Sequence, residues 1–250
     1  MNIYIMVDME GISGIHTREQ TKVDGLYFEE GRRYLTADVN ACAEACKEAG
    51  ADKVYVRDAH NNGSFIMWEG LSPAVDYIVK GGAGYDVRFA GAEDCDGVIL
   101  LGYHAMTGTK DAIISHTMDL EHRYFLNGTE IGEIAFDAAM ATEQKSLPII
   151  MVSGDDKACA EAKHFLPWVT TCEVKRGLGW DRGLLLAPAK AYAKIREKTI
   201  EAIGRIKDAK LYPITTPVTI EQIVPEKPLR VGKAATMTEA LFNRHFVEEK

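Results

Sequence analysis

The sequence predicts an α/β fold, with a mostly parallel sheet flanked by helices in a Rossmann-like three-layer core and a smaller C-terminal α/β unit. Short β-prone runs alternate with longer runs of helical periodicity, as in βαβ units. Four of the β-prone runs are almost entirely apolar, which strands covered on both faces require. The composition, with 46% hydrophobic and 26% charged residues, is that of a globular protein able to bury such a core.

The predicted strands begin at the N-terminus with the run NIYIMV. Together the β-prone runs occupy residues 2–7, 52–57, 74–79, 97–103 and 148–154. The segment from about residue 27 to 49 has helical character, and Gly50 follows it as a typical C-terminal cap. A second helical pattern covers residues 189–206 and is preceded by Pro188. The first half of the chain therefore alternates strand and helix.

One segment departs from the parallel pattern. Asn127-Gly128 lies between two short β-prone runs within residues 124–133, which predicts a two-residue hairpin. Its second arm runs into a helix over residues 133–144. After Leu211 the chain is rich in Pro and Thr, with β-prone pieces and a last short helix around residues 236–246.

Two units are expected from this pattern. We expect residues 1–186 to form the metal-binding catalytic core and residues 187–250 to form the smaller C-terminal α/β unit, with a role in oligomerisation. Asp155 and Asp156 end a predicted strand, and we expect them to cap the next helix rather than to orient a ligating histidine.

Charge and cysteine content exclude several classes of protein. The formal net charge of -8 argues against a nucleic-acid partner. No apolar stretch approaches the roughly 20 residues that span a bilayer, and no basic segment precedes the first hydrophobic run, so we expect a cytoplasmic protein without membrane contact. The five cysteines form no CxxC pair, which predicts neither a disulfide framework nor a thiolate zinc site.

Acidic and imidazole side chains follow three of the apolar runs. Asp8 and Glu10 follow the first run, Asp58 and His60 the second, and His104 the third. The carboxyl ends of parallel strands meet at one edge of a sheet, where ligands bind. A turn-forming role accounts for Asp58 but does not account for two histidines and a glutamate. We therefore expect these side chains to form a common site.

Two imidazoles with two or three carboxylates and no thiolate suit Zn²⁺, Mn²⁺ or Fe²⁺ better than Ca²⁺, and zinc is the first choice. In an extended segment Asp8 and Glu10 project to the same side. Asp8, which is nearest to the strand end, is the natural bridging ligand because a carboxylate has two oxygens. Two metal ions about 3.5 to 4 Å apart hold a hydroxide between them and polarise the oxygen of the group that it attacks.

Five motifs in unbroken order over roughly residues 1–185 carry a family resemblance. They are VDMEGISG (7–14), DAHNN (58–62), LGYHAM (101–106), SHTM (115–118) and NGTEIGE (127–133). With them the sequence resembles the DppA-type zinc-dependent D-aminopeptidases associated with dipeptide-transport operons. The resemblance implies two zinc ions per subunit, held by Asp8, Glu10, His60, His104 and Glu133, with Asp8 as the bridge.

The resemblance also implies a catalytic histidine at His116. Its role is open between a proton shuttle, a stabiliser of the oxyanion and a nucleophile, and we favour the first two because a metal-bound hydroxide already supplies the attacking group. By residue pattern alone, His116 is a core histidine and Glu133 is a favourable acid in the first turn of a helix.

The function expected from these features is a metallo-aminopeptidase that removes N-terminal residues, including D-amino acids such as D-Ala, from short peptides. The resemblance further implies a homo-oligomeric ring, a decamer, with active sites that face an inner channel. One alternative is another dinuclear hydrolase, an amidase or a phosphoesterase, although only Arg57 and Arg123 lie near the metal motifs. A second alternative is a non-catalytic peptide-binding accessory protein of a dipeptide transporter.

Overall fold

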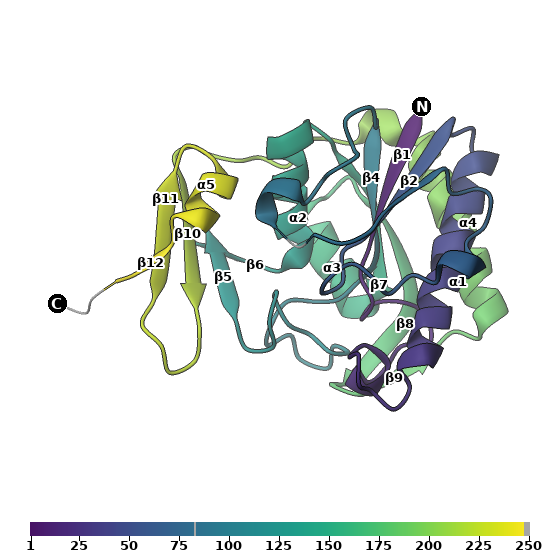
Figure 1. Ribbon diagram of the computed structural model, residues 1–250, viewed down its shortest axis with the longest axis horizontal. Helices are drawn as coiled ribbons and strands as arrows, with labels where there is room; N and C mark the ends of the chain where they lie inside the picture. The colour runs from purple at the N-terminus through teal and green to yellow at the C-terminus, as the bar shows by residue number, and fades with distance from the viewer. Residues whose placement is uncertain (83, 248–250) are drawn as a thin grey trace.

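The computed structural model describes residues 1–82 and 84–247 and confirms the α/β fold, with a seven-stranded sheet as its core (Figure 1). In spatial order the strands of this first sheet are β3 (Tyr77–Val79), β2 (Lys53–Asp58), β1 (Asn2–Val7), β4 (Gly97–Tyr103), β7 (Ile149–Asp155), β8 (Thr170–Gly179) and β9 (Arg182–Leu185). All neighbouring strands run parallel except β8 and β9, which are antiparallel.

Helices cover both faces of the first sheet and make three layers (Figure 1). They are α1 (Phe28–Glu48), α2 (Glu133–Lys145), α3 (Asp156–Phe165) and α4 (Pro188–Gly204). Successive residues of β1 enter different layers, since Tyr4 packs with Phe136 of α2 and Ile5 packs with Leu35 of α1. This alternation explains why β1 and β4 are apolar at nearly every position.

A second, antiparallel sheet lies beside the core, at the left of Figure 1. In spatial order it contains β12 (His245–Phe246), β11 (Arg230–Ala234), β10 (Val218–Ile223), β5 (Arg123–Leu126) and β6 (Thr129–Ile131), with α5 (Met237–Phe242) packed on β10 and β11. The predicted β5–β6 hairpin is confirmed. Asn127 and Gly128 have φ values of 50° and 81°, which a two-residue turn of this type requires.

The two sheets do not coincide with the two units expected from the sequence. The β5–β6 hairpin, within residues 1–186, pairs with β10 of the C-terminal region. Helix α4, within residues 187–250, packs on α1 and β8 of the core. The division at residue 186 stays a prediction.

Some elements differ in length from the expectation. Strand β3 has only three residues, because Ser72 and Val75 form a turn and Asp76 accepts from the Val54 amide. Strands β8 and β9 were not predicted, since β8 alternates buried and half-buried residues instead of forming an apolar run. The last helix ends at Phe242, and the strand β12 follows.

The cysteines are free, as predicted, and four of them are buried while Cys95 is half-buried. Over residues 1–82 and 84–247, the helices include none with the length and apolar character needed to cross a membrane.

Candidate metal centre

Three neighbouring strands bring the predicted residues to one edge of the first sheet. Strand β1 lies between β2 and β4, and Asp8, His60 and His104 follow the carboxyl ends of these strands within two residues. All three residues are at least 93% buried. The three side chains that were expected to form a common site therefore lie together at one edge of the sheet.

Two glycines let the segments after β1 and β4 approach each other closely. The Gly11 amide donates to the Gly102 carbonyl at 2.7 Å. A Cβ atom on Gly11 would lie 2.0 Å from the Tyr103 carbonyl oxygen, and one on Gly102 would lie 2.4 Å from the Asp8 carbonyl oxygen. Side chains at either position would separate Glu10 from His104. Glycine is thus needed at positions 11 and 102, which lie beside the cluster.

The loop that carries His60 is organised by Asp58. Its Oδ2 atom accepts from the amides of Phe65 and Ile66 at 2.6 and 2.9 Å. The turn-forming role of Asp58 is confirmed by these bonds. Because the loop is closed in this way, His60 points back toward β1.

Asp8 stands between two histidines. Its Oδ1 lies 2.9 Å from His60 Nδ1, and its Oδ2 lies 3.2 Å from His104 Nε2. Glu10 Oε2 is 3.1 Å from the same His60 nitrogen, and Glu133 Oε1 is 3.4 Å from the same His104 nitrogen. Two clusters of two carboxylates and one imidazole therefore share Asp8, each with its potential ligand atoms within 4.8 Å of one another.

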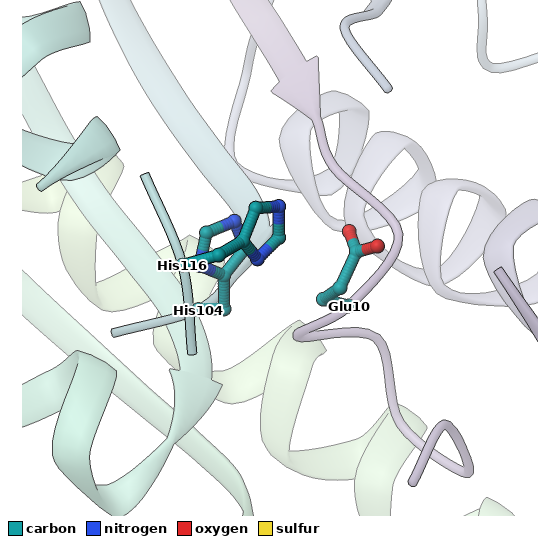
Figure 2. Close-up of side chains that lie close together, drawn as sticks. All are labelled: Glu10, His104 and His116. Carbon is teal, nitrogen blue, oxygen red and sulfur yellow. The ribbon is translucent and has the colours of Figure 1, made fainter. Parts of the chain in front are cut away.

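His116 lies against the second cluster. Its ring stacks on His104 with centroids 3.9 Å apart and an interplanar angle of 12°, and its Nε2 is 3.8 Å from Glu133 Oε1. Figure 2 shows the two imidazoles one over the other, with Glu10 approaching from the segment after β1. Glu10, His104 and His116 also satisfy the spacing of a metal-ligand set.

Each of the three histidines has one ring nitrogen placed against a backbone carbonyl. The pairs are His60 Nε2 with Thr21 at 2.9 Å, His104 Nδ1 with Ala105 at 3.0 Å and His116 Nδ1 with Ile114 at 2.8 Å. A carbonyl only accepts, so these nitrogens carry protons, and the other ring nitrogens face the carboxylates. Metal-ligating histidines are oriented in the same way by their second nitrogen.

The electrostatics of the cluster favour a cation at its centre. Burial opposes the charge on Asp8, yet the adjacent imidazoles of His104 and His60 hold the pKa of that carboxyl well below its usual range. Burial likewise opposes charge on the two imidazoles, and the surrounding carboxylates nevertheless raise the pKa of both well above the usual range. The carboxylates of the cluster thus stabilise positive charge next to them, despite the burial of the site.

The chemistry of the donor set fits zinc. Glu10 Oε2 and His104 Nε2 are buried and have no hydrogen-bond partner among the described residues, which is costly for polar atoms unless a ligand satisfies them. Carboxylate oxygen and imidazole nitrogen are both usual zinc ligands. The residues present therefore fit a pair of metal ions that share Asp8.

Two features around the cluster were not predicted from the sequence. Lys175 of β8 is 2% exposed and donates to the carbonyls of Glu10, Ile12 and Ile15 at 2.6, 2.9 and 2.7 Å. It therefore holds the segment that carries Glu10. The only sequence signal is a lysine within a β-prone run.

The second unpredicted feature is the pair of Asp137 and Arg88. Asp137 is completely buried one turn after Glu133 on α2 and pairs with Arg88. The four-residue spacing of two acids on one helix was a signal that the sequence offered.

Asp155 has the expected capping role and an additional one. Its carboxylate accepts from the Lys157 and Ala158 amides at the start of α3, so the capping prediction is confirmed. The other carboxylate oxygen accepts from the Ile113 amide at 2.9 Å, which anchors the segment leading to His116.

A cavity of about 490 Å³ opens onto the cluster. Asp8, His60, His116 and Glu133 line it, together with Arg88 and several residues of the loops. A larger cavity of about 950 Å³ lies beyond residues 115–122, and none of the described residues that line it belongs to the cluster. A further hollow of about 90 Å³ is lined by Glu10, His60 and His116. The cavity of about 490 Å³ is the larger of these two, and it reaches Asp8 and Glu133.

Comparison with known proteins identifies the family of this chain. The family model described as D-aminopeptidase matches residues 1–240. The chain belongs to the D-aminopeptidase family. It is 36% identical to a curated D-aminopeptidase from Bacillus subtilis (strain 168), over 87% of this chain and 78% of the relative.

The fold of the family is also found in a solved structure. The structure described as the Zn-dependent D-aminopeptidase DppA from Bacillus subtilis, a self-compartmentalizing protease, matches with a TM-score of 0.87 at 28% identity. The match covers 97% of this chain and 95% of that one. The sequence-based assignment to this family is thereby confirmed.

The structure brings together all six residues predicted for the site. Asp8, Glu10, His60, His104 and Glu133 form the two clusters, and His116 borders the second.

Proposed function

We propose that this member of the D-aminopeptidase family is a zinc-dependent aminopeptidase that removes N-terminal residues, including D-Ala, from short peptides. The observation that carries the proposal is the sharing of Asp8 between two buried clusters of potential ligands. The family assignment and the likeness to a structure named as a Zn-dependent D-aminopeptidase support it.

Two zinc ions per subunit would be held by five residues. Asp8, Glu10 and His60 would hold one ion, and Asp8, His104 and Glu133 would hold the other. Zinc ions bound there supply Lewis acidity to the scissile carbonyl and lower the pKa of a water molecule. The orientation of the ligands is fixed beforehand by the backbone carbonyls that accept from His60 and His104.

His116 is the proposed catalytic residue. Its Nδ1 proton is donated to the Ile114 carbonyl, so Nε2 is the nitrogen available on the cavity side. This atom accepts a proton from the attacking water and returns it to the leaving amine, or as the imidazolium stabilises the developing oxyanion. The ring is held by stacking on His104, which limits its motion during the reaction.

The proposal is tested with metal-loaded protein and alanine dipeptides and amides of both D and L configuration. We expect release of the N-terminal residue from at least one of these substrates, and loss of that activity when a chelator removes the metal. Restoration by added Zn²⁺ would separate metal dependence from irreversible unfolding. No turnover by metal-loaded protein would contradict the proposal.

A homo-oligomeric ring, a decamer, is proposed together with this function, with residues 187–250 contributing contacts between subunits. The related structure is that of a self-compartmentalizing protease, which supports assembly of this chain. Exposed Trp68, Leu184 and Phe242 provide apolar surface for subunit contacts. Sedimentation velocity measures the mass directly, and a monomer at working concentration would contradict the ring.

A further inference from the structure

A second charged group faces the same cavity as the metal-binding clusters. Arg88 follows a short 3₁₀ helix, Tyr85–Val87, and lines the cavity of about 490 Å³ with Asp8 and Glu133. Its side chain is only 11% exposed. The proposed hydrolysis leaves this buried cation without a role.

Arg88 is held in a fixed orientation by the helix behind it. Its Nε and Nη2 atoms donate to the two oxygens of Asp137 at 2.5 and 2.8 Å, and the Tyr103 hydroxyl donates to Asp137 at 2.6 Å. A bidentate pair of this kind fixes the plane of the guanidinium. The remaining nitrogen, Nη1, has no acceptor among residues 1–82 and 84–247, and Arg88 lines the cavity.

Helix α2 sets the spacing between the guanidinium and the metal-binding clusters. Glu133 and Asp137 are four residues apart on one helix face, which is about 6 Å along the axis. One residue beyond the scissile bond spans at most about 3.5 Å, and an N–H···O hydrogen bond adds about 2.9 Å. This reach of a single residue that ends in a hydrogen-bond acceptor is comparable with the rise between Glu133 and Asp137, the residue that pairs with Arg88.

We propose that Arg88 binds the free C-terminal carboxylate of the substrate, so that the cavity selects dipeptides. This inference rests on the proposed aminopeptidase function. A carboxylate is the group that complements the free N–H donors of Nη1, and the same cation repels the ammonium at the other end of the peptide. The substrate then lies with its C-terminus at Arg88 and its scissile bond at the clusters.

The test compares D-Ala-D-Ala with its C-terminal amide. Wild-type protein should prefer the free acid by about tenfold to a hundredfold in kcat/KM, the range expected for hydrogen bonds to a charged group. In the double variant Arg88→Met/Asp137→Asn the ratio should fall to about one, mainly through the KM of the acid. The second substitution is needed because Arg88→Met alone leaves a buried, unpaired carboxylate.

A matched control is available on the second sheet. Arg123 makes the same bidentate pair with Glu130, at 2.6 and 2.8 Å, but does not line the cavity. Arg123→Met should leave the preference for the acid unchanged. A second readout is calorimetric binding of a reduced dipeptide, in which CH₂–NH replaces the peptide bond, as the acid and as the amide.

The possible outcomes separate the two proposals. Equal preference for the acid in wild type and double variant would overturn the role of Arg88. An equal loss on acid and amide would also overturn it, since that result would make Arg88 a support for α2. If wild-type protein hydrolyses no peptide, the proposed function fails, and the acid-to-amide ratio in binding of the reduced dipeptide still decides for or against Arg88.

Discussion

The substitution Lys175→Met isolates the anchoring of the segment that carries Glu10. The ammonium of Lys175 donates to three carbonyls of this segment. The Ile12 carbonyl also accepts from the Ile15 amide, so the substitution leaves two carbonyls, those of Glu10 and Ile15, without a donor among the described residues. Methionine has a similar length and introduces no charge.

Two opposing effects limit the change in the free energy of unfolding, the loss of hydrogen bonds to carbonyls and the removal of a buried charge. Two buried carbonyls without donors cost about 1 to 3 kcal/mol each. Burial lowers the pKa of Lys175 to about 8 from 10.5, against the opposing effect of Asp155, Asp38 and Glu10, and the loss of this buried charge returns about 3 kcal/mol at pH 7. We expect a net destabilisation of no more than about 3 kcal/mol by this sum.

The affinity for zinc should also fall. Groups that orient metal ligands typically contribute about tenfold to a hundredfold to affinity, and Lys175 holds the backbone of Glu10. The assay is zinc competition against a chromophoric chelator, with urea unfolding of metal-free protein measured in parallel. Lys163→Met is the control, because Lys163 also donates to a backbone carbonyl, that of Val169, but away from the clusters. Wild-type zinc affinity in a folded Lys175→Met protein would refute the reasoning.

Three further predictions follow from the site and its surroundings. His116→Gln should lower kcat by about 10² to 10⁴ while two zinc ions per chain remain bound; loss of one ion on elemental analysis would make His116 a ligand instead. Removal of the metal by a chelator should lower the Tm by about 10 to 20 °C in calorimetry. Each of the two sites contributes about 2.7 kcal/mol to the free energy of unfolding when the metal concentration is a hundred times the Kd. An unchanged Tm would contradict metal binding to the folded state. Burial raises the pKa of Asp38 to about 7 from 3.8, against its hydrogen bonds from Ser13, so the native state binds the extra proton and stability falls as the pH rises from about 4 to 7. Over this range the free energy of unfolding of Asp38→Asn, measured with urea, should rise by up to about 4 kcal/mol relative to that of the wild type. Parallel pH profiles of the two proteins would contradict this prediction.

The sequence was sufficient to predict the edge of the sheet that carries the site. Asp8, His60 and His104 follow apolar runs, and parallel strands place their carboxyl ends together. Glu133 and His116 were assigned only through the family resemblance, because they reach the cluster from a helix start and a loop rather than from a strand end.

The remaining parts depend on contacts between distant residues. Lys175 meets Glu10 across 165 positions of the chain, and Arg88 meets Asp137 across 49. No local periodicity reports such pairs. Strand β8 escaped prediction for a related reason, since its alternating pattern resembles a half-exposed strand, whereas β1 and β4 form nearly continuous apolar runs.

The most direct test of the two-metal site is the metal content of the purified wild-type protein and of three variants that lack a proposed ligand. Wild-type protein should contain about two zinc ions per chain by elemental analysis, the number implied by two clusters that share one carboxylate. His60→Ala and His104→Ala should each retain about one ion, and Asp8→Ala should retain neither at the same free zinc concentration. A wild-type protein with no bound metal, or an Asp8→Ala variant that keeps both ions, would contradict the two-metal site.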